Sequence, residues 1–265
     1  MAGRSIATRT ATGRTKRAGS RARATTTDRG TDRAEVRPAR VTAARRVRVE
    51  RKRATAAAAS GRERSVNPAR APRLARVERK TRETDIALAL NLDGEGRSRI
   101  RTGIGFLDHM LTSLATHARF DLDVRCRGDL HVDAHHSVED VGIALGQALK
   151  QALGDKRGIV RFGHAYVPLD EALTRAVVDL SGRPWLHFGA QFRAQRVGDL
   201  PTELLEDFFW ALVDHGRFNL HLDLVRGRNA HHIAETLFKA TARALATAVA
   251  RDPRVLGVPS TKGSL

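Results

Sequence analysis

The stretch His135-His136-Ser137-Val138-Glu139 returns later in the chain as His231-His232-Ile233-Ala234-Glu235. Upstream of each copy, Phe106-Leu107-Asp108-His109-Met110-Leu111 corresponds to Leu204-Leu205-Glu206-Asp207-Phe208-Phe209. Both copies then reach Arg-Phe-Asp/Asn-Leu at the same spacing, at 119–122 and 217–220. Several blocks repeated in register indicate an internal duplication, in which two similar units pack against each other.

The sequence around these blocks alternates between strand and helix patterns. Period-two alternation predicts strands at 84–91 and 174–180. Helical spacing predicts helices at 106–117, 134–153, 202–214 and 230–250. Each half therefore reads strand-strand-helix-strand-helix, with repeats at about 82–167 and 168–265. We predict an α+β fold of two sheets with the helices packed between them.

The net charge of +18 is confined to the start of the chain, since residues 1–80 hold 24 of the 47 Lys and Arg but only six of the 29 Asp and Glu. That segment has no aromatic residue, so we predict a disordered Arg/Ala/Thr-rich extension before a folded body at 81–265. The composition of this segment is typical of an extension that is not under selection, of a targeting segment, or of a tail that contacts nucleic acid or an anionic surface. Nucleic-acid binding is the weaker reading, because stacking aromatics are missing.

The single cysteine, Cys126, excludes an internal disulfide and favours a reducing compartment, so we expect a cytoplasmic protein. No apolar run approaches the length of a membrane span.

The His-His-x-x-Glu motif is suited to metal ligation. On a helix, His135 and Glu139 are four residues apart and share a face, whereas His136 is rotated by about 100°. One helix can thus offer two ligands to one metal and one to another, within the chain or across subunits. Imidazole and carboxylate ligands suit Mn, Fe, Co or Zn, and the absence of thiolates argues against a structural zinc site. His109 is a further candidate ligand.

The duplication pairs His109 with Asp207. Aspartate is a good ligand for Mn or Mg but is shorter and harder than imidazole. If Asp207 is a ligand, the two metals have unlike surroundings. If it is not, one metal is a ligand short.

A second group of residues is suited to holding a phosphate. Arg161, Arg183 and Lys239 lie in or beside Gly-rich or helical segments, and 259–263 (PSTKG) ends the chain with hydroxyls, backbone N–H groups and a lysine.

Five blocks in this order resemble the imidazoleglycerol-phosphate dehydratase family over about 82–265. They are Gly103-Ile104-Gly105-Phe106-Leu107-Asp108-His109-Met110, His135-His136-Ser137-Val138-Glu139-Asp140, Pro168-Leu169-Asp170-Glu171-Ala172-Leu173, His231-His232-Ile233-Ala234-Glu235 and Pro259-Ser260-Thr261-Lys262-Gly263.

The resemblance implies dehydration of D-erythro-imidazole-glycerol phosphate to imidazole-acetol phosphate, a step of histidine biosynthesis. It also implies two Mn²⁺ ions per active site and a 24-subunit assembly with active sites at subunit interfaces. The implied metal ligands are His109, His135, His136, Glu139, His231, His232 and Glu235, with Asp207 where the family usually has histidine. The implied contacts to the substrate and its phosphate are Glu83, His109, Arg161, Arg183, Lys239, Ser260, Thr261 and Lys262.

Two carboxylates are the candidates for proton transfer. The hydrogen to be removed has no adjacent carbonyl, so the reaction is expected to proceed through a metal-bound imidazolate that expels the hydroxyl. Glu83 is the preferred candidate and Glu171 the second, although Glu171 is equally suited to orienting a ligating histidine. The alternatives are a metal-dependent phosphoester hydrolase on the same scaffold and nucleic-acid binding through the basic tail.

Overall fold

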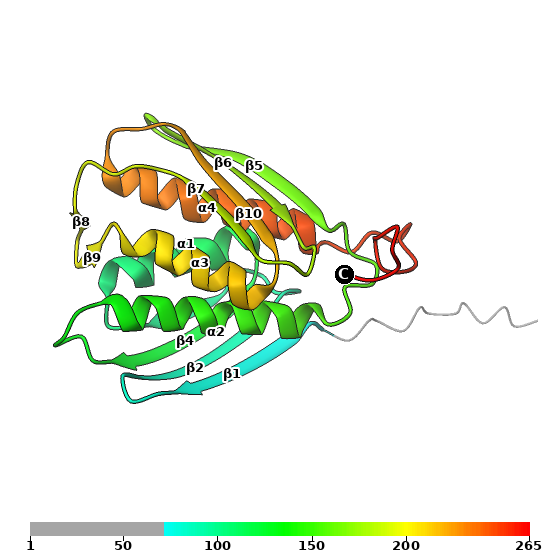
Figure 1. Cartoon of the computed structure of the whole chain (residues 1–265), viewed down its shortest axis with the longest axis horizontal. Helices are drawn as coiled ribbons and strands as arrows, with labels where there is room; N and C mark the ends of the chain where they lie inside the picture. The colour runs from blue at the N-terminus through cyan, green and yellow to red at the C-terminus, as the bar shows by residue number, and fades with distance from the viewer. Residues whose placement is uncertain (1–71) are drawn as a thin grey trace, which may run out of the picture. The chain divides into compact units, whose positions relative to one another are not determined.

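Two four-stranded sheets enclose a layer of helices in the computed structural model, which describes residues 72–265 (Figure 1). The first half contains β1 (Leu74–Lys80), β2 (Thr84–Asn91), β3 (Ser98–Arg101), α1 (Gly105–Ala118), β4 (Asp121–Gly128) and α2 (His135–Leu153). The second half contains β5 (Phe162–Leu169), β6 (Ala172–Asp179), β7 (Trp185–Gly189), β8 (Arg196–Val197), β9 (Leu200–Pro201), α3 (Leu204–Gly216), β10 (Asn219–Arg226) and α4 (Ala230–Val249).

The sheet topology repeats the duplication. The strand orders are β1-β2-β4-β3 and β5-β6-β10-β7, and in each sheet one edge strand, β3 or β7, runs parallel to its neighbour. The short β8–β9 hairpin is an insertion in the second copy. The predicted α+β fold, with helices between two sheets, is confirmed.

Two predicted boundaries are wrong. Leu74–Lys80 is not part of an extension that reaches residue 80, because it forms β1 and pairs with β2 along its whole length. The border between repeats at 167/168 falls inside β5. Each unit has three strands of its main sheet before its first helix instead of two, and the second unit also has the short β8–β9 hairpin there. The rest of the prediction of disorder falls on residues 1–71, which lie outside the described residues.

Alternation along the strands directs one face of each sheet onto the helices. In β2, for example, Ile86, Leu88 and Leu90 are buried while Asp85 points outward. At the centre, Phe208, Phe209 and Phe238 pack with ring centroids 4.9–5.3 Å apart. Burial of these apolar side chains is the main stabilising contribution to the fold.

The helices pair across the duplication, α1 with α4 and α2 with α3. Glycines on α2 permit the second pairing, since a Cβ on Gly142 would lie 2.7 Å from the Phe208 carbonyl oxygen and one on Gly146 would lie 2.6 Å from that of Leu212. The corresponding positions of α4 are Phe238 and Ala242, so the two helix pairs are packed differently. Cross-pairing places each His-His helix beside the first helix of the other copy.

In residues 72–265, no helix combines the length and the apolar character needed to cross a bilayer.

Candidate metal centre

The two His-His pairs lie at the first turns of α2 and α4. The side chain of Asn229 accepts hydrogen bonds from the N–H groups of His231 and His232, and Asp133 accepts one from the N–H of His135. Asn229 is thus the N-cap of α4, whereas in α2 the bond from Asp133 satisfies the N–H group of the first helical residue. As the i, i+4 spacing predicts, His231 Nε2 lies 3.2 Å from Glu235 Oε2 and His135 Nε2 lies 3.6 Å from Glu139 Oε2.

His109 of α1 joins the motif of α4, and we call this group the α1–α4 cluster (His109, His231, Glu235). One ligand atom from each residue lies within 4.8 Å of the others, as a shared cation requires. Glu235 Oε2 is 3.4 Å from His109 Nε2. Phe106 packs beside the two imidazoles, 5.1 Å from the His231 ring and 6.2 Å from the His109 ring. The cluster is therefore preassembled from two helices that belong to different copies of the repeat.

Asp207 of α3 joins the motif of α2, and we call this group the α2–α3 cluster (His135, Glu139, Asp207). His135 Nδ1 lies 3.8 Å from Asp207 Oδ2. The three side chains are 44–46% exposed, against 13% for Glu235. The structure thus places Asp207 at the position equivalent to His109, in a group whose glutamate is more exposed and whose histidine is about as exposed as those of the α1–α4 cluster.

Lys239 distinguishes the two clusters. Its Nζ lies 2.6 Å from Glu235 Oε1, which leaves Oε2 facing the histidines. Burial alone would raise the pKa of Glu235. The hydrogen bond and positive charge of Lys239, together with the interaction with His109, outweigh burial, so the pKa of Glu235 is lowered. The equivalent position in the first copy is the buried Ile143. Within residues 72–265, Glu139 forms no ion pair with a lysine.

The second histidine of each pair turns toward carboxylates outside the clusters. His136 Nδ1 lies 3.1 Å from Asp129, and its Nε2 lies 3.7 Å from Glu83. The hydrogen bond with Asp129 raises the pKa of His136. In the other copy, His232 Nδ1 lies 2.7 Å from Glu171 and its Nε2 lies 3.8 Å from Asp170. In both histidines Nε2 has no hydrogen bond within the described chain, so it is the atom left to bind a metal.

Glu171 is held by several donors at once. Besides the bond to His232, its Oε1 accepts hydrogen bonds from the N–H groups of Arg228 and Asn229. The His232 bond is the largest influence, and together these donors lower the pKa of Glu171 to about 2. A carboxylate so strongly stabilised as the anion is a weak base, which favours the role of orienting His232 over that of accepting a proton.

The predicted phosphate residues gather around the C-terminal segment. Arg161 donates to both carboxylate oxygens of Asp179, at 2.7 and 3.2 Å, and to the carbonyl of Pro259 at 2.8 Å. Ser260, Thr261 and Lys262 follow directly, and a Cβ on Gly182, beside Arg183, would lie only 2.7 Å from the carbonyl carbon of Leu265.

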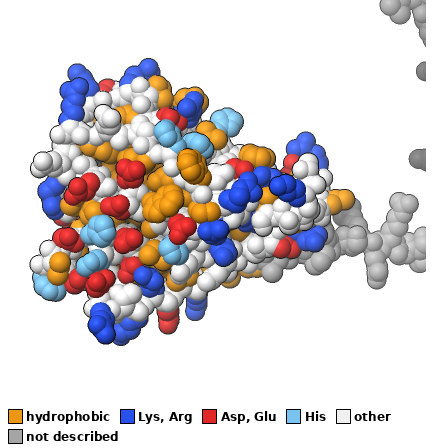
Figure 2. All heavy atoms as spheres, viewed as in Figure 1, with side chains coloured by type: hydrophobic (Ala, Val, Ile, Leu, Met, Phe, Trp, Pro, Cys, Tyr) orange, Lys and Arg blue, Asp and Glu red, His pale blue; other side chains and the backbone are white. Residues whose placement is uncertain are grey.

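Lys239 is separate from this phosphate group, because the two ends of α4 carry different sites. Arg161 donates its N–H to Ala248, in the last turn of α4, whereas Glu235 lies near the first turn. Thirteen residues at a rise of 1.5 Å separate these positions by about 20 Å. Figure 2 shows His, Asp and Glu side chains intermingled on the left of this face, and a group of Lys and Arg side chains toward the C-terminal segment on the right, with further Lys and Arg side chains along the other edges.

Three carboxylates that contact the histidines and Arg161 were not predicted from the sequence: Asp129, Asp170 and Asp179. Asp129 directly follows β4, Asp170 precedes Glu171 in the β5–β6 turn, and Asp179 ends β6. Their positions at strand ends were the only available signal, and strand ends do not reveal which histidine or arginine they face.

Comparison with known proteins gives a consistent result. The family model described as imidazoleglycerol-phosphate dehydratase matches residues 102–245. The chain is 59% identical over 196 residues to the imidazoleglycerol-phosphate dehydratase of Methylobacillus flagellatus, covering 74% of this chain and 99% of that one. It is 60% identical over 194 residues to the protein of that name from Gluconobacter oxydans, covering 73% and 98%.

Solved structures of the same name are similar in fold. The crystal structure from Staphylococcus aureus is 41% identical with a TM-score of 0.62, covering 68% of this chain and 99% of that one. The structure from Pyrococcus furiosus, in complex with (S)-C348, is 35% identical with a TM-score of 0.63, covering 71% and 100%.

Proposed function

Since the chain belongs to the imidazoleglycerol-phosphate dehydratase family and is a hydro-lyase of histidine biosynthesis, we propose that its two clusters hold the cations that assist this dehydration. The observation that carries the proposal is the convergence of His109, His231 and Glu235 within 4.8 Å. The enzyme removes water from imidazoleglycerol phosphate to give imidazole-acetol phosphate. We place this activity in the cytoplasm.

The donor set fits divalent manganese. Each cluster offers imidazole nitrogen and carboxylate oxygen, a mixture that suits Mn²⁺ and leaves positions open for substrate. The α1–α4 cluster would hold one ion and the α2–α3 cluster, with Asp207, the other. When bound, these ions would lower the pKa of the substrate imidazole N–H and so favour departure of the hydroxyl.

The remaining roles in the reaction are assigned to two carboxylates and one lysine of the chain. Glu83 is half-exposed, and the one ion-pair contact of its carboxylate within residues 72–265 is to His136 Nε2 at 3.7 Å, so we assign it the role of accepting the proton from the substrate carbon. Glu171 keeps His232 in the tautomer with Nδ1–H, which frees Nε2 for a metal. Lys239 holds one oxygen of Glu235 and thereby turns the other toward His109 and His231.

One subunit does not bring all of these groups together. The phosphate residues at Arg161 and the C-terminal segment lie about 20 Å along α4 from Glu235, too far for one small substrate to reach both. We therefore propose that the active site combines residues of different subunits, in a homo-oligomer of 24 chains.

The outer face of the second sheet supports self-association. Phe162, Tyr166 and Trp185 are 56–59% exposed there, and Val177 is 39% exposed. The charges among them are paired, Arg161 with Asp179 and Arg175 with Asp223. A neutral aromatic surface of this kind is typical of a protein–protein interface.

A mixed-oligomer experiment tests both the metal site and its sharing between chains. Arg161→Ala and Glu235→Gln should each be inactive with Mn²⁺, and co-assembly of the two variants should restore a fraction of the dehydration activity. Restoration requires that Arg161 of one chain acts with Glu235 of another. Absence of restoration in proven mixed particles would contradict sharing, and full activity of Glu235→Gln alone would contradict the metal site.

A further inference from the structure

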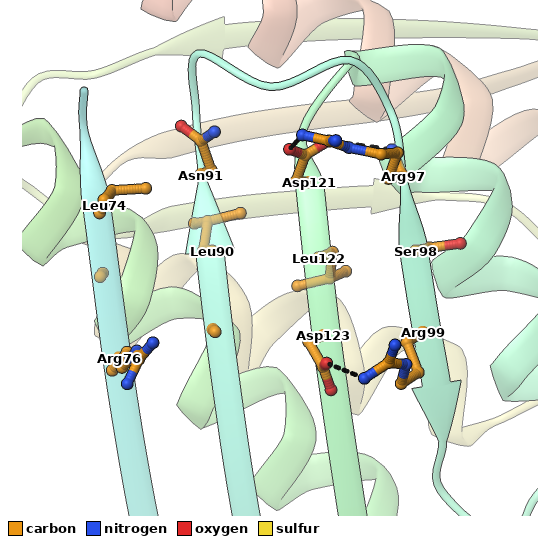
Figure 3. A pocket seen from close by; sticks show the side chains of 12 residues that line it. Leu74, Arg76, Leu90, Asn91, Arg97, Ser98, Arg99, Asp121, Leu122 and Asp123 are labelled. Atoms are coloured by element: carbon orange, nitrogen blue, oxygen red, sulfur yellow. Dashed lines mark hydrogen bonds and ion pairs between the residues drawn. The ribbon is translucent and has the colours of Figure 1, made fainter.

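The outer face of the first sheet carries a groove whose lining contains none of the residues assigned above to the dehydration reaction. Two hollows, of about 360 and 720 Å³, lie over the sheet and share four lining residues: Arg76, Ala89, Arg99 and Asp123. The small side chains of Ala87 and Ala89 on β2 form the floor. Figure 3 shows the smaller hollow, with Arg76 on β1 facing Asp123 and Arg99 across β2.

The groove holds more positive charge than its own acids neutralise. Arg97 pairs with Asp121 at 2.7 Å, and Arg99 with Asp123 at 3.7 Å. In contrast, Arg76, Arg101 and Arg125 form no ion pair or hydrogen bond within residues 72–265, and no dashed line reaches Arg76 in Figure 3. Glu78 is the one unpaired acid of the lining.

The strand register places two of these arginines directly beside each other. Arg101 of β3 is the Cα partner of Arg125 of β4. Like charges at directly opposed positions are unfavourable unless an anion lies between them. Two guanidinium groups on neighbouring strands offer paired N–H donors, the arrangement that binds phosphate oxygens well.

The dimensions of the groove select an extended anion. Strands lie about 4.8 Å apart, so Arg76 on β1 is two strands from Arg125 and three from Arg101, or roughly 10–14 Å across the sheet. A single phosphate between Arg101 and Arg125 would leave Arg76 unused, whereas a chain of phosphates would reach both walls. The outer face presents no aromatic residue, so stacking of nucleic-acid bases has no platform there.

We propose that this groove is an oligophosphate-binding site, separate from the dehydration site. Arg101 and Arg125 bind one end of the phosphate chain and Arg76 binds the other. The ligand is either an inorganic oligophosphate or the phosphate chain of a nucleotide, which share this chemistry. The second sheet lacks such a site, because its outer face carries paired charges and aromatic side chains.

Titration calorimetry of the full chain with sodium tripolyphosphate, without added metal, tests the site. The double variant R101Q/R125Q should bind at least about tenfold more weakly than the unchanged protein. The matched control R193Q/R243Q also removes two exposed arginines, but outside the groove, and should stay within about twofold, as expected for a small change in overall charge. Dehydration activity should be unchanged in R101Q/R125Q, which also verifies its folding.

Equal loss of binding in both double variants would overturn the proposal, because the binding would then reflect net charge. No loss in either would overturn it as well. A parallel titration with ATP distinguishes the sources of the ligand. Equal affinity for ATP and tripolyphosphate supports recognition of the phosphate chain alone, and tighter binding of ATP that is lost in R101Q/R125Q supports a nucleotide.

Discussion

The α1–α4 and α2–α3 clusters descend from one repeated motif, yet they differ in the exposure of their glutamates and in charge. In the first, Glu235 is 13% exposed, paired with Lys239, and within 3.4 Å of two imidazoles. In the second, Glu139 and Asp207 are 46% exposed, and the two contacts of His135 measure 3.6 and 3.8 Å. A helical motif therefore supplies two candidate ligands in both copies, while the helix packed against it determines the rest of the site.

The positions around the motif account for this difference. Lys239 of the second copy occupies the position of Ile143 in the first copy. Phe106 of the first copy, which packs on His109 and His231, occupies the position of Leu204 in the second copy. In the α1–α4 cluster the carboxylate is only 13% exposed and pairs with a lysine, whereas the histidines of the two clusters are about equally exposed. Among the described residues, Glu139 of the α2–α3 cluster has no lysine partner.

Loss of the buried carboxylate should have the largest effect on this comparison. We expect Glu235→Gln to reduce kcat/KM at least about a thousandfold, equivalent to about 4 kcal/mol, because it removes a metal ligand and releases Lys239. Steady-state kinetics with Mn²⁺ and metal analysis per subunit measure the effect. Glu139→Gln is the matched variant and should lose metal only from the α2–α3 cluster. Identical loss of both metals in the two variants would contradict two separate clusters.

The close packing of α2 on α3 should be the next most sensitive feature. Gly146→Val would place its side chain against the Leu212 carbonyl oxygen, because even a single Cβ at this position would lie 2.6 Å from that oxygen. We expect a loss of about 3 kcal/mol in the free energy of unfolding, measured by urea denaturation. Ala242→Val, at the equivalent position of α4, is the control and should cost less. An equal cost in both would show that the two helix pairs are packed alike.

Asp207 offers a way to compare the clusters by metal affinity. Asp207→Ala should weaken Mn²⁺ binding at the α2–α3 cluster about tenfold, measured by competition with a chelating dye. His109→Ala, its counterpart, should weaken the α1–α4 cluster more, because His109 lies 3.4 Å from its carboxylate neighbour whereas Asp207 lies 3.8 Å from His135. Unchanged affinity in Asp207→Ala would remove Asp207 from the ligands.

The smallest expected effect concerns the start of α1. Asp199 of the β8–β9 hairpin accepts hydrogen bonds from the N–H groups of Gly105 and Phe106, at 2.6 and 3.0 Å. Burial raises the pKa of Asp199, but these bonds outweigh it and lower the pKa. A lowered pKa means that the stabilisation is present above the ordinary aspartate value of about 3.9 and is lost as the pH falls through the folded value.

Asp199→Ala should therefore cost about 1 kcal/mol at pH 7 and less at pH 3, as read from urea midpoints at the two pH values. Asp85→Ala, which removes an exposed carboxylate from the first sheet, should change the midpoint little at either pH. A cost that is independent of pH would show that the charge of Asp199 does not stabilise α1.

Much of the site was predictable because its central relation is local. The i, i+4 spacing places His135 with Glu139 and His231 with Glu235 whatever surrounds the helices. The same spacing also predicted that His136 and His232 would turn elsewhere. The alternation of the strands and the repeat predicted two sheets around four helices. The first strand, Leu74–Lys80, was missed because its arginines and lysine resemble the basic segment before it, although Ala75 and Val77 are buried.

The two helical motifs, their duplication and the fold class follow from the order of the residues, because periodicity and repetition act between residues close in the chain. The pairing of His109 with α4 and of Asp207 with α2 became visible only in the folded protein. The same is true of the contacts of Asp129 and Glu171 with the outer histidines, and of the position of Lys239 beside the proposed metal ligands instead of beside Arg161. These relations depend on which helix faces pack together and on the length of α4. Packing follows from the shapes of contacting surfaces, such as the close approach at Gly146, and no spacing within the chain encodes it.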